Sequence, residues 1–192
     1  ILANGALSGG GEEYKIRKKL IENDLVEAIL ILPQNMFYTT TISVTIWILN
    51  ANKKERTFEQ NNITKTHRDR TNEILFMDLR KLGVAFEKKF IQFDTETIEK
   101  ISSTYHTWQS DKEAYEDIAE YCKSATLSEL IAKDYSLVPS KYIEFVNRDE
   151  NIDFDTKMTA LQSEFVELLK EEEKSKQELL TVFKDLGYEI KL

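Results

Sequence analysis

The chain has 192 residues, of which 41% are hydrophobic and 31% are charged, and its formal net charge is −8 at pH 7. This size allows one domain or a domain with an appendage, and the balance of apolar and charged residues is that of a globular rather than a disordered protein. The negative charge argues against a segment that grips DNA phosphates by itself, and no apolar run approaches the roughly 18 residues that cross a bilayer.

The first 23 residues are predicted to contain the end of a strand, a glycine-rich connection and a helix. The opening residues ILANG look like the end of a strand that began earlier, which suggests a fragment of a longer chain. Gly9, Gly10 and Gly11 lack the GxGxxG and GxxxxGK spacings of phosphate-binding loops, so they favour a flexible connection. The helix from Glu12 to Asn23 is expected to be half-buried, with Ile16, Leu20 and Ile21 on its inner side and Arg17, Lys18 and Lys19 elsewhere.

Two buried strands follow. The segment Leu25–Leu32 is almost wholly apolar, which is typical of a strand covered on both faces, and Pro33 ends it because proline cannot donate to a ladder. The segment Ile42–Leu49 is rich in β-branched and aromatic residues and forms the second strand. The nine residues from Pro33 to Thr41 permit an antiparallel return, because a crossover helix would need more chain.

The polar segment Asn52–Asn72 is predicted to be a long exposed loop. Between Lys53 and Glu73 the chain carries six lysines and arginines against four acids, although the net charge of the whole chain is negative. Such cations position DNA by binding phosphates, but a solvated loop explains them equally well. The candidate phosphate contacts are Lys53, Lys54, Arg56, Arg68 and Arg70.

Shorter elements follow this segment. Ile74–Leu79 is a third strand, and Asp94 is suited to cap the helix that comes next. Thr126 and Glu129 have the spacing of a capping box for a short helix, and Pro139 closes that unit. The helix after Asp94 is expected to carry Ile98, Ile101, Tyr105 and Trp108 on one face.

The sequence predicts neither a catalytic thiol nor a metal site. The single cysteine, Cys122, lies in a strand-like YCKSA, far in sequence from His67 and His106, so a packed small hydrophobe is expected. The two histidines lack the spacing of metal ligands. A lone thiol suits a reducing cytoplasm, which is the predicted location.

The last segment is a long helix. From Asp155 to Leu186 there is neither proline nor glycine, and Gly187 stands where a C-terminal cap belongs. At about 1.5 Å per residue the helix would extend roughly 48 Å, and its narrow apolar seam calls for a partner helix. Glu172 and Ser175 are polar positions within that seam. The apolar seam residues are Met158, Leu161, Phe165, Leu168, Leu179, Val182 and Leu186.

Seven blocks of the chain resemble, in order, the methylation subunit of type I restriction-modification systems, which is an N6-adenine DNA methyltransferase. They are LANGALS from Leu2, KIRKKLIENDLVEAI, the FYTTTIS loop, ILFMDLRKLG from Ile74, IEKISSTYHTW from Ile98, YCKSATLSEL from Tyr121 and YSLVPSKYI from Tyr135. The loop departs from the family pattern, which has a proline after its isoleucine and often a glycine before it. Thr40, Thr41 and Ser43 stand in that neighbourhood instead, which puts the shape of the loop in doubt.

The resemblance implies an α/β fold, namely the C-terminal part of a class I, Rossmann-like, S-adenosylmethionine-dependent methyltransferase sheet. The sheet would include its antiparallel closing hairpin and would be followed by short α+β elements and a long C-terminal helix. Residues 1–150 would be the C-terminal part of the methyltransferase domain, and residues 151–192 an amphipathic subunit-docking tail. The complete enzyme would transfer a methyl group from S-adenosylmethionine to N6 of adenine in DNA.

The motifs for that chemistry are missing from the chain. It has neither a glycine-rich strand-to-helix turn for the cofactor nor an Asn-Pro-Pro-aromatic loop for an extruded adenine, and the nearest text is LPQNMFY. We therefore expect no catalytic, cofactor-binding or metal-binding residues here, and no activity or cofactor binding by the chain alone. Phe37 and Tyr38 are candidates to flank the target base, although loop aromatics more commonly plug the end of a sheet. Thr39, Thr40 and Thr41 could bind phosphates or bond locally to the backbone.

The resemblance also implies partners. These are the specificity subunit, for which the long helix is the expected docking element, the restriction (nuclease) subunit, and DNA through the assembled complex. The alternative hypothesis is a non-catalytic interaction module, such as a truncated gene product, that only binds partner subunits.

Overall fold

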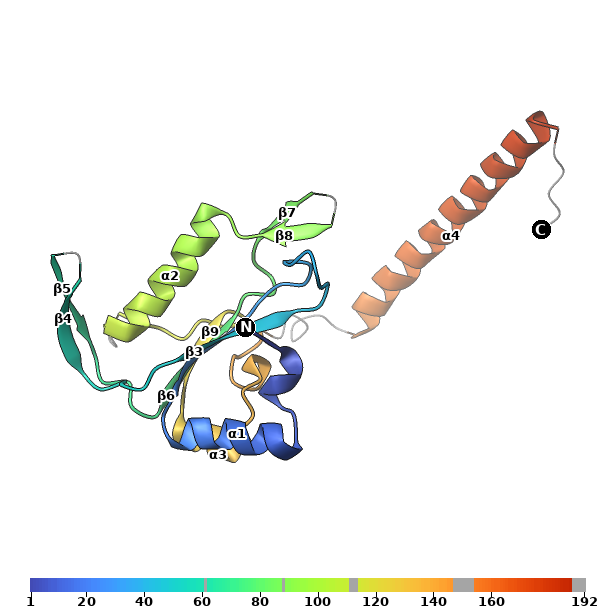
Figure 1. Cartoon of the computed structure of the whole chain (residues 1–192). Coiled ribbons are helices and arrows are strands. Elements are labelled where there is room, and N and C mark those ends of the chain that lie inside the picture. Colours follow the sequence, from blue (N-terminus) through green and yellow to red (C-terminus); the bar gives the residue numbers. More distant parts are fainter. Residues whose placement is uncertain (61, 88, 111–113, 147–153, 188–192) are drawn as a thin grey trace. The chain divides into compact units, whose positions relative to one another are not determined.

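The computed structural model describes residues 1–60, 62–87, 89–110, 114–146 and 154–187. The chain divides into two compact units, Ile1–Val146 and Asn147–Leu192. The first unit contains a five-stranded sheet with helices on both faces, and the second contains one long helix (Figure 1).

The sheet of the first unit is mixed. Its strand order is β1-β3-β2-β6-β9, in which β2 pairs antiparallel with β3 and parallel with β6. The antiparallel return predicted for the two long apolar segments is confirmed. The strands are β1 (Leu2–Ala3), β2 (Val26–Ile31), β3 (Val44–Leu49), β6 (Glu73–Asp78) and β9 (Cys122–Thr126).

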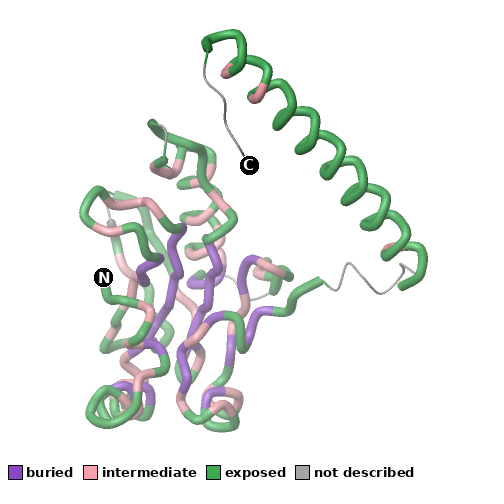
Figure 2. Tube along the Cα trace, turned by 90° about the vertical axis from the view of Figure 1, so that its right-hand side faces the viewer, coloured by how far each residue is buried: buried purple, intermediate pink, exposed green. Residues whose placement is uncertain are grey.

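Strand β2 is buried along its whole length, as its continuous apolar sequence predicts. The amide of Leu32 still donates to the carbonyl of Val44 at 2.9 Å, and the ladder stops at Pro33, which has no N–H to donate. Figure 2 shows the buried residues concentrated in the strands at the centre of this unit.

Two apolar layers cover the two faces of the sheet. One layer joins Val26, Ile29 and Phe76 to residues of α1, α3 and the segment around η2. The other joins Leu30, Met77 and Trp108, so α2 covers the opposite face. The helices are α1 (Gly11–Glu22), α2 (Thr95–Ser110) and α3 (Leu127–Ala132), with the 3₁₀ turns η1 (Asn4–Leu7) and η2 (Pro139–Lys141).

The predicted helix caps are present. The carboxylate of Asp94 accepts a hydrogen bond from the amide of Thr97 at 2.8 Å, and Thr126 and Glu129 form a reciprocal capping box. Trp108 is fully buried on the inner face of α2, whereas Ile98 at the start of the same predicted face is 54% exposed.

The predicted inner side of α1 was wrong at two positions. Ile16 is exposed, whereas Arg17 is buried. The guanidinium of Arg17 donates to the carbonyls of Ala6, Gly9 and Tyr135 at 2.9–3.1 Å, so it satisfies backbone acceptors both before α1 and after α3. These three hydrogen bonds offset the desolvation cost of the buried charge. Arg17 therefore faces inward, although the apolar pattern predicted that Ile16 would.

The prediction of one long loop over Asn52–Asn72 was wrong. The segment contains an antiparallel hairpin of β4 (Arg56–Gln60) and β5 (Ile63–His67), which projects from the body of the unit (Figure 1). Cross-strand pairs stabilise the hairpin: the hydroxyls of Thr57 and Thr66 lie 3.1 Å apart, and the rings of Phe58 and His67 meet edge to face.

A second hairpin was not predicted. It consists of β7 (Val84–Phe86) and β8 (Phe90–Gln92), and it begins at Gly83, whose φ is +97°. A side chain at Gly83 would approach the methyl of Ile91 to 2.7 Å, so only glycine fits this turn.

A buried carboxylate joins the sheet to α2 and to the β4–β5 hairpin. Glu27 lies where the β2–β3 register shifts, at a β-bulge, and it is almost fully buried. It accepts hydrogen bonds from Arg70 at 3.1 Å, from Gln109 of α2 at 3.2 Å and from Asn50 at 2.7 Å. We refer to Glu27, Asn50, Arg70 and Gln109 as the Glu27 cluster.

The second unit is the helix α4 (Phe154–Asp185), and none of its residues is buried. Gly187 has a φ of +83°, and its amide donates to the carbonyl of Lys184 at 3.0 Å. The predicted helix and its glycine cap are therefore confirmed. Within the described residues, no helix is long and apolar enough to span a membrane.

The Glu27 cluster should dominate the stability of the first unit. Replacing Arg70 with methionine leaves the Glu27 carboxylate buried without a cation, which should lower the free energy of unfolding by about 3–5 kcal/mol in urea titrations. The control Lys54→Met, at an exposed position, should change it by less than about 0.5 kcal/mol. Removing both charges with Glu27→Leu/Arg70→Met should restore part of the loss, and an Arg70→Met chain as stable as wild type would contradict this assignment.

The stability of the hairpin should depend on pH through His67. Burial, together with repulsion from Arg70 and Arg56, lowers the pKa of the His67 imidazole. The unfolded chain therefore takes up a proton near pH 6.5 that the folded chain takes up only at lower pH, so stability is full above about pH 6.5 and falls below it.

The urea midpoint of the wild type should accordingly fall between pH 7.5 and 5.5 by more than that of His67→Gln. The variant Lys54→Met, which keeps His67 and removes an exposed side chain, should retain the wild-type pH dependence. Equal slopes for wild type and His67→Gln would show that His67 does not contribute.

Candidate functional site

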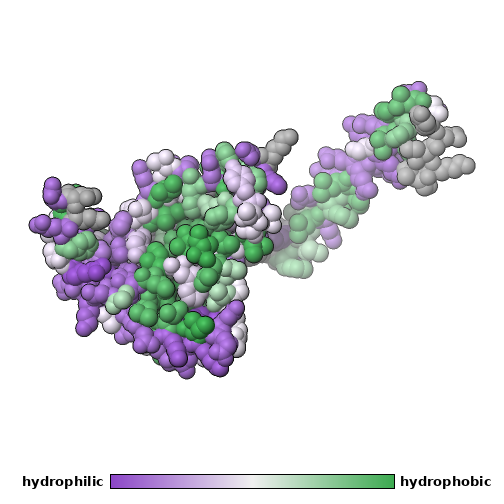
Figure 3. All heavy atoms as spheres, viewed as in Figure 1, coloured by the Kyte–Doolittle hydropathy of each residue, from purple (hydrophilic) through white to green (hydrophobic). Residues whose placement is uncertain are grey.

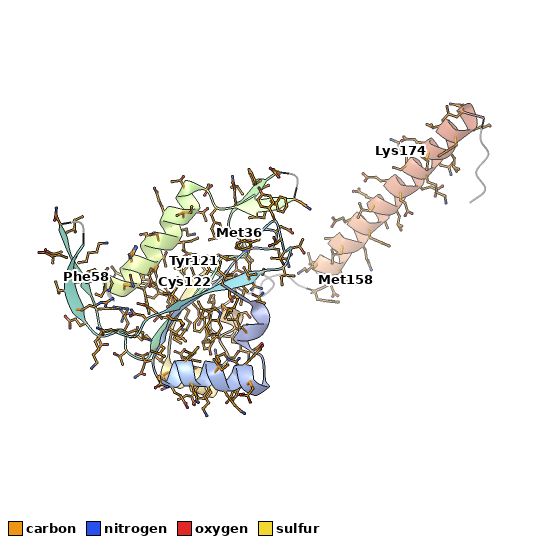
Figure 4. All side chains as sticks on the ribbon, in the orientation of Figure 1. Met36, Phe58, Tyr121, Cys122, Met158 and Lys174 are labelled. Atoms are coloured by element: carbon orange, nitrogen blue, oxygen red, sulfur yellow. The ribbon has the colours of Figure 1, made fainter. Side chains whose placement is uncertain are left out.

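The loop between β2 and β3 carries the predicted base-flanking aromatics, and the structure gives them different surroundings. Phe37 is half-buried and packs against the apolar layer on the α2 face, as does Met36, which Figure 4 labels. Tyr38 is 73% exposed, and its ring meets the edge of the Phe90 ring at a centroid distance of 4.7 Å. Phe37 thus helps to close the core, whereas Tyr38 projects from the surface.

The threonines of this loop bond locally. The amide of Thr40 donates to the carbonyl of Phe37 at 3.4 Å, and the hydroxyl of Thr40 accepts from the amide of Ile42. The carbonyl of Thr41 accepts from the amide of Asn35 at 3.2 Å. Thr39 is exposed and lies at the tip, next to Tyr38. The loop is therefore a tight turn that presents Tyr38.

A cleft of about 560 Å³ lies beside this loop, at the carboxyl ends of β1, β2 and β6. Ligands of open α/β sheets commonly bind at this end of the strands. The amide oxygen of Asn4 is buried there without a hydrogen-bond partner among the described residues. The cleft is lined by Asn4, Pro33, Gln34, Asn35, Ile42, Ser43, Arg80, Lys81, Leu82, Gly83 and Ile91.

Arg80 and Lys81 are the two cations among the residues that line the cleft. The guanidinium of Arg80 donates to both carboxylate oxygens of Asp78: Nε lies 2.9 Å from Oδ1, and Nη2 lies 2.5 Å from Oδ2. The hydrogen bonds to Asp78 raise the pKa of Arg80, so the group stays charged at every relevant pH. Sequence reasoning missed Asn4 and Arg80, because their convergence depends on strands that are distant in the chain.

Two of the predicted phosphate contacts face the interior, and for them the prediction is corrected. Lys53 is 3% exposed: its ammonium pairs with Asp24 at 2.5 Å and donates to the carbonyls of Val26 and Glu73. Arg70 is fully buried in the Glu27 cluster. Both cations donate to buried acceptors at the ends of the strands. The apolar side chains around these acceptors could not hydrogen-bond to them.

The remaining predicted contacts differ in their accessibility. Arg68 pairs with Glu73 at 2.7 Å and donates to the carbonyl of Trp108, so it links the hairpin to α2. Lys54 and Arg56 are exposed, and for them phosphate binding stays a prediction. The hairpin follows the carboxyl end of β3, so these cations lie at the opposite end of the sheet from Tyr38 (Figure 1). The structure does not bring the two predicted DNA-contacting groups together.

The glycine run before α1 does not fit a cofactor phosphate or carboxylate. The first turn of α1 contains Glu12 and Glu13, whose charges oppose an anion at the helix N-terminus. A Cβ at Gly9 would displace the flexible carboxylate of Glu13 and lie 3.0 Å from the carbonyl oxygen of Gly5, so there is little room for a side chain here. The glycine run therefore does not suit the carboxylate of S-adenosylmethionine.

Cys122 lies in the core, as Figure 4 shows next to Tyr121, and burial raises the pKa of its thiol. The prediction of a packed cysteine is confirmed. Within the described residues, no group of histidine, cysteine, aspartate and glutamate side chains could hold a metal ion.

Comparisons with known proteins agree on one family. Residues 1–151 match the family model described as N-6 DNA methylase. The chain is 37% identical, over 98% of its length, to the methylase subunit of the type I restriction enzyme HindI of Haemophilus influenzae. It is 33% identical, over 94% of its length, to the MjaVII methylase subunit of Methanocaldococcus jannaschii. The chain spans only 40% and 27% of the lengths of these two relatives.

Solved structures show the same relationship. The methyltransferase subunit of a type I restriction-modification system from Streptococcus thermophilus matches 74% of this chain, with a TM-score of 0.58 and 28% identity, and the match covers 25% of that subunit. The type I restriction enzyme EcoKI M protein matches 93% of this chain and 40% of its own length, with a TM-score of 0.51 and 14% identity, and so supports the fold alone. The chain belongs to the N-6 DNA methylase family and corresponds to part of a type I restriction-modification methylase subunit.

Proposed function

We propose that the chain is the C-terminal region of a methylation subunit whose complete form transfers a methyl group from S-adenosylmethionine to N6 of adenine in DNA. The cofactor site and the Asn-Pro-Pro-aromatic loop would lie in other residues of the complete subunit, so the chain alone is not expected to bind the cofactor or to act on DNA. The observation that carries this proposal is the β2–β3 hairpin, whose loop presents Tyr38 at the carboxyl edge of the sheet in a chain of this family.

The proposal extends to a Rossmann-like sheet in the complete subunit, with residues 1–150 as its C-terminal part. Strand β1 pairs with β3 at only two positions, opposite Val44 and Thr45. Burial then decreases along β3 until Leu49 is exposed, together with Ile1 and Leu2. Figure 3 shows a broad hydrophobic area on the side of the first unit that carries β3. A further strand on this open edge would cover it.

Tyr38 would contact the extruded adenine or its neighbouring backbone. Its ring is exposed, it is braced at one edge by Phe90, and it lies beside the cleft that contains Asn4 and Arg80. Stacking of a base on an aromatic ring contributes about 1–3 kcal/mol. Phe37 would support the loop from inside.

Replacing Tyr38 with alanine in the complete subunit, assembled with its specificity subunit, should lower the rate of methyl transfer at least about tenfold. The thermal midpoint should change little, because the side chain is exposed. The control is Ile63→Ala, which removes an exposed apolar side chain at the opposite end of the sheet and should leave the rate unchanged. An unchanged rate in Tyr38→Ala would remove this residue from the site.

We also propose that residues 151–192 form a docking tail for the specificity subunit, and that DNA and the nuclease subunit join through the assembled complex. The support is that every apolar residue of the α4 seam is exposed, from Met158 to Val182, as is Leu186 immediately after the helix.

Deleting residues 155–192 should therefore abolish capture of the tagged specificity subunit in a pull-down, while the remaining first unit keeps its cooperative urea transition. Undiminished capture by the shortened chain would refute the docking role of α4.

A further inference from the structure

Helix α4 carries its apolar residues in two blocks rather than in one stripe. The first block runs from Met158 to Leu169 and the second from Leu179 to Leu186, and Figure 4 labels Met158 in the first. The nine residues between them, Lys170 to Glu178, include no apolar residue. At 1.5 Å per residue this polar segment separates the blocks by about 15 Å.

The acidic residues of α4 are not evenly distributed around it. The seam follows a seven-residue register, and one flanking row of that register is acidic at four consecutive repeats. Within the described residues of that row, Glu178 has an ion-pair partner, Lys174, at 3.8 Å, and both side chains are exposed. A surface pair of this kind contributes little, so the row keeps its negative field. The acidic row consists of Glu164, Glu171, Glu178 and Asp185, and it follows Lys157, which occupies the same register position in the first turns of the helix.

This arrangement opposes pairing of α4 with a second copy of itself. In a parallel pair, Glu172 would face the same residue of the other copy at the centre of the seam. In an antiparallel pair that aligns the apolar blocks, Glu171 would face Glu178 and Glu164 would face Asp185. Either orientation places like charges opposite each other. Such contacts disfavour pairing with a second copy but do not weaken binding to a partner of complementary charge.

We propose that α4 selects a partner helix with lysines or arginines along the flank that faces the acidic row, and with a cation or hydrogen-bond donor opposite Glu172. The partner would contact the two apolar blocks on either side of this central polar layer. The inference rests on the proposed docking function and adds what the docked surface must carry. The acidic row sets the choice of partner, and the apolar blocks supply most of the affinity.

The test compares two charge reversals of equal size in the full 192-residue chain. Glu164→Lys/Glu171→Lys reverses the flanking row, whereas Glu167→Lys/Glu173→Lys reverses two acids on the outer side of the same helix. Affinity for the specificity subunit is measured by fluorescence anisotropy at 50 and 300 mM salt. The flank variant should bind about tenfold more weakly at low salt, with the difference shrinking at high salt, and the outer variant should bind within about twofold of wild type.

The possible results separate the two proposals. Equal weakening by both variants, or weakening by neither, would overturn the charge selection. Binding that survives deletion of residues 155–192 would instead overturn the docking function itself. Sedimentation velocity of the wild-type chain should show a monomer, and a dimer that disappears when residues 155–192 are deleted would overturn the exclusion of a second copy.

Discussion

Strand β2 is the constraint on which the first unit depends, because it is buried along its whole length and is hydrogen-bonded on both sides. Its two faces contribute side chains to both apolar layers. One layer packs against α1 and α3, and the other packs against α2. The one charge inside it, Glu27, cannot stay buried without donors, and Arg70, Gln109 and Asn50 supply them. A single carboxylate therefore fixes the positions of α2 and of the hairpin base.

The direction of β2 also decides what the unit can do. Its carboxyl end leads into the loop of Tyr38 and the cleft with Asn4 and Arg80, and the parallel strand β6 ends at the same edge. Because β3 returns in the opposite direction, the β4–β5 hairpin is placed at the other end of the sheet. Tyr38 and the exposed cations Lys54 and Arg56 therefore cannot form one compact site. This separation is why we propose the cleft edge, and not the hairpin, as the part of this unit that contributes to the target-base site.

The sequence was informative where a local pattern decides the structure. The apolar run of β2, the antiparallel return to β3, the caps at Asp94 and Thr126, and the long helix ending before Gly187 follow from residues close in the chain. Seven short sequence segments were also enough to indicate the family.

The remaining features depend on partners distant in the chain. Arginine and lysine are usually surface residues, yet Arg17, Lys53 and Arg70 are buried. Each donates hydrogen bonds to acceptors that come close only when the chain folds. The β4–β5 hairpin was missed because its strands are short and polar, and cross-strand pairs such as Thr57–Thr66 cannot be recognised before the register is known. Phe37 and Tyr38 are both loop aromatics in the sequence. Only the packing of the folded chain shows that Phe37 is half-buried and Tyr38 is exposed.

We propose that β3 is an interior strand of a larger sheet in the complete methylation subunit. Amide hydrogen exchange of residues 46–49 measures this directly in the isolated chain and in the complete subunit. We expect the amides on the outer edge of β3 to exchange quickly in the isolated chain and to be strongly protected in the complete subunit, while those that face β2 are protected in both. Equal exchange at the outer edge in the two proteins would show that no further strand pairs there, and would contradict the account.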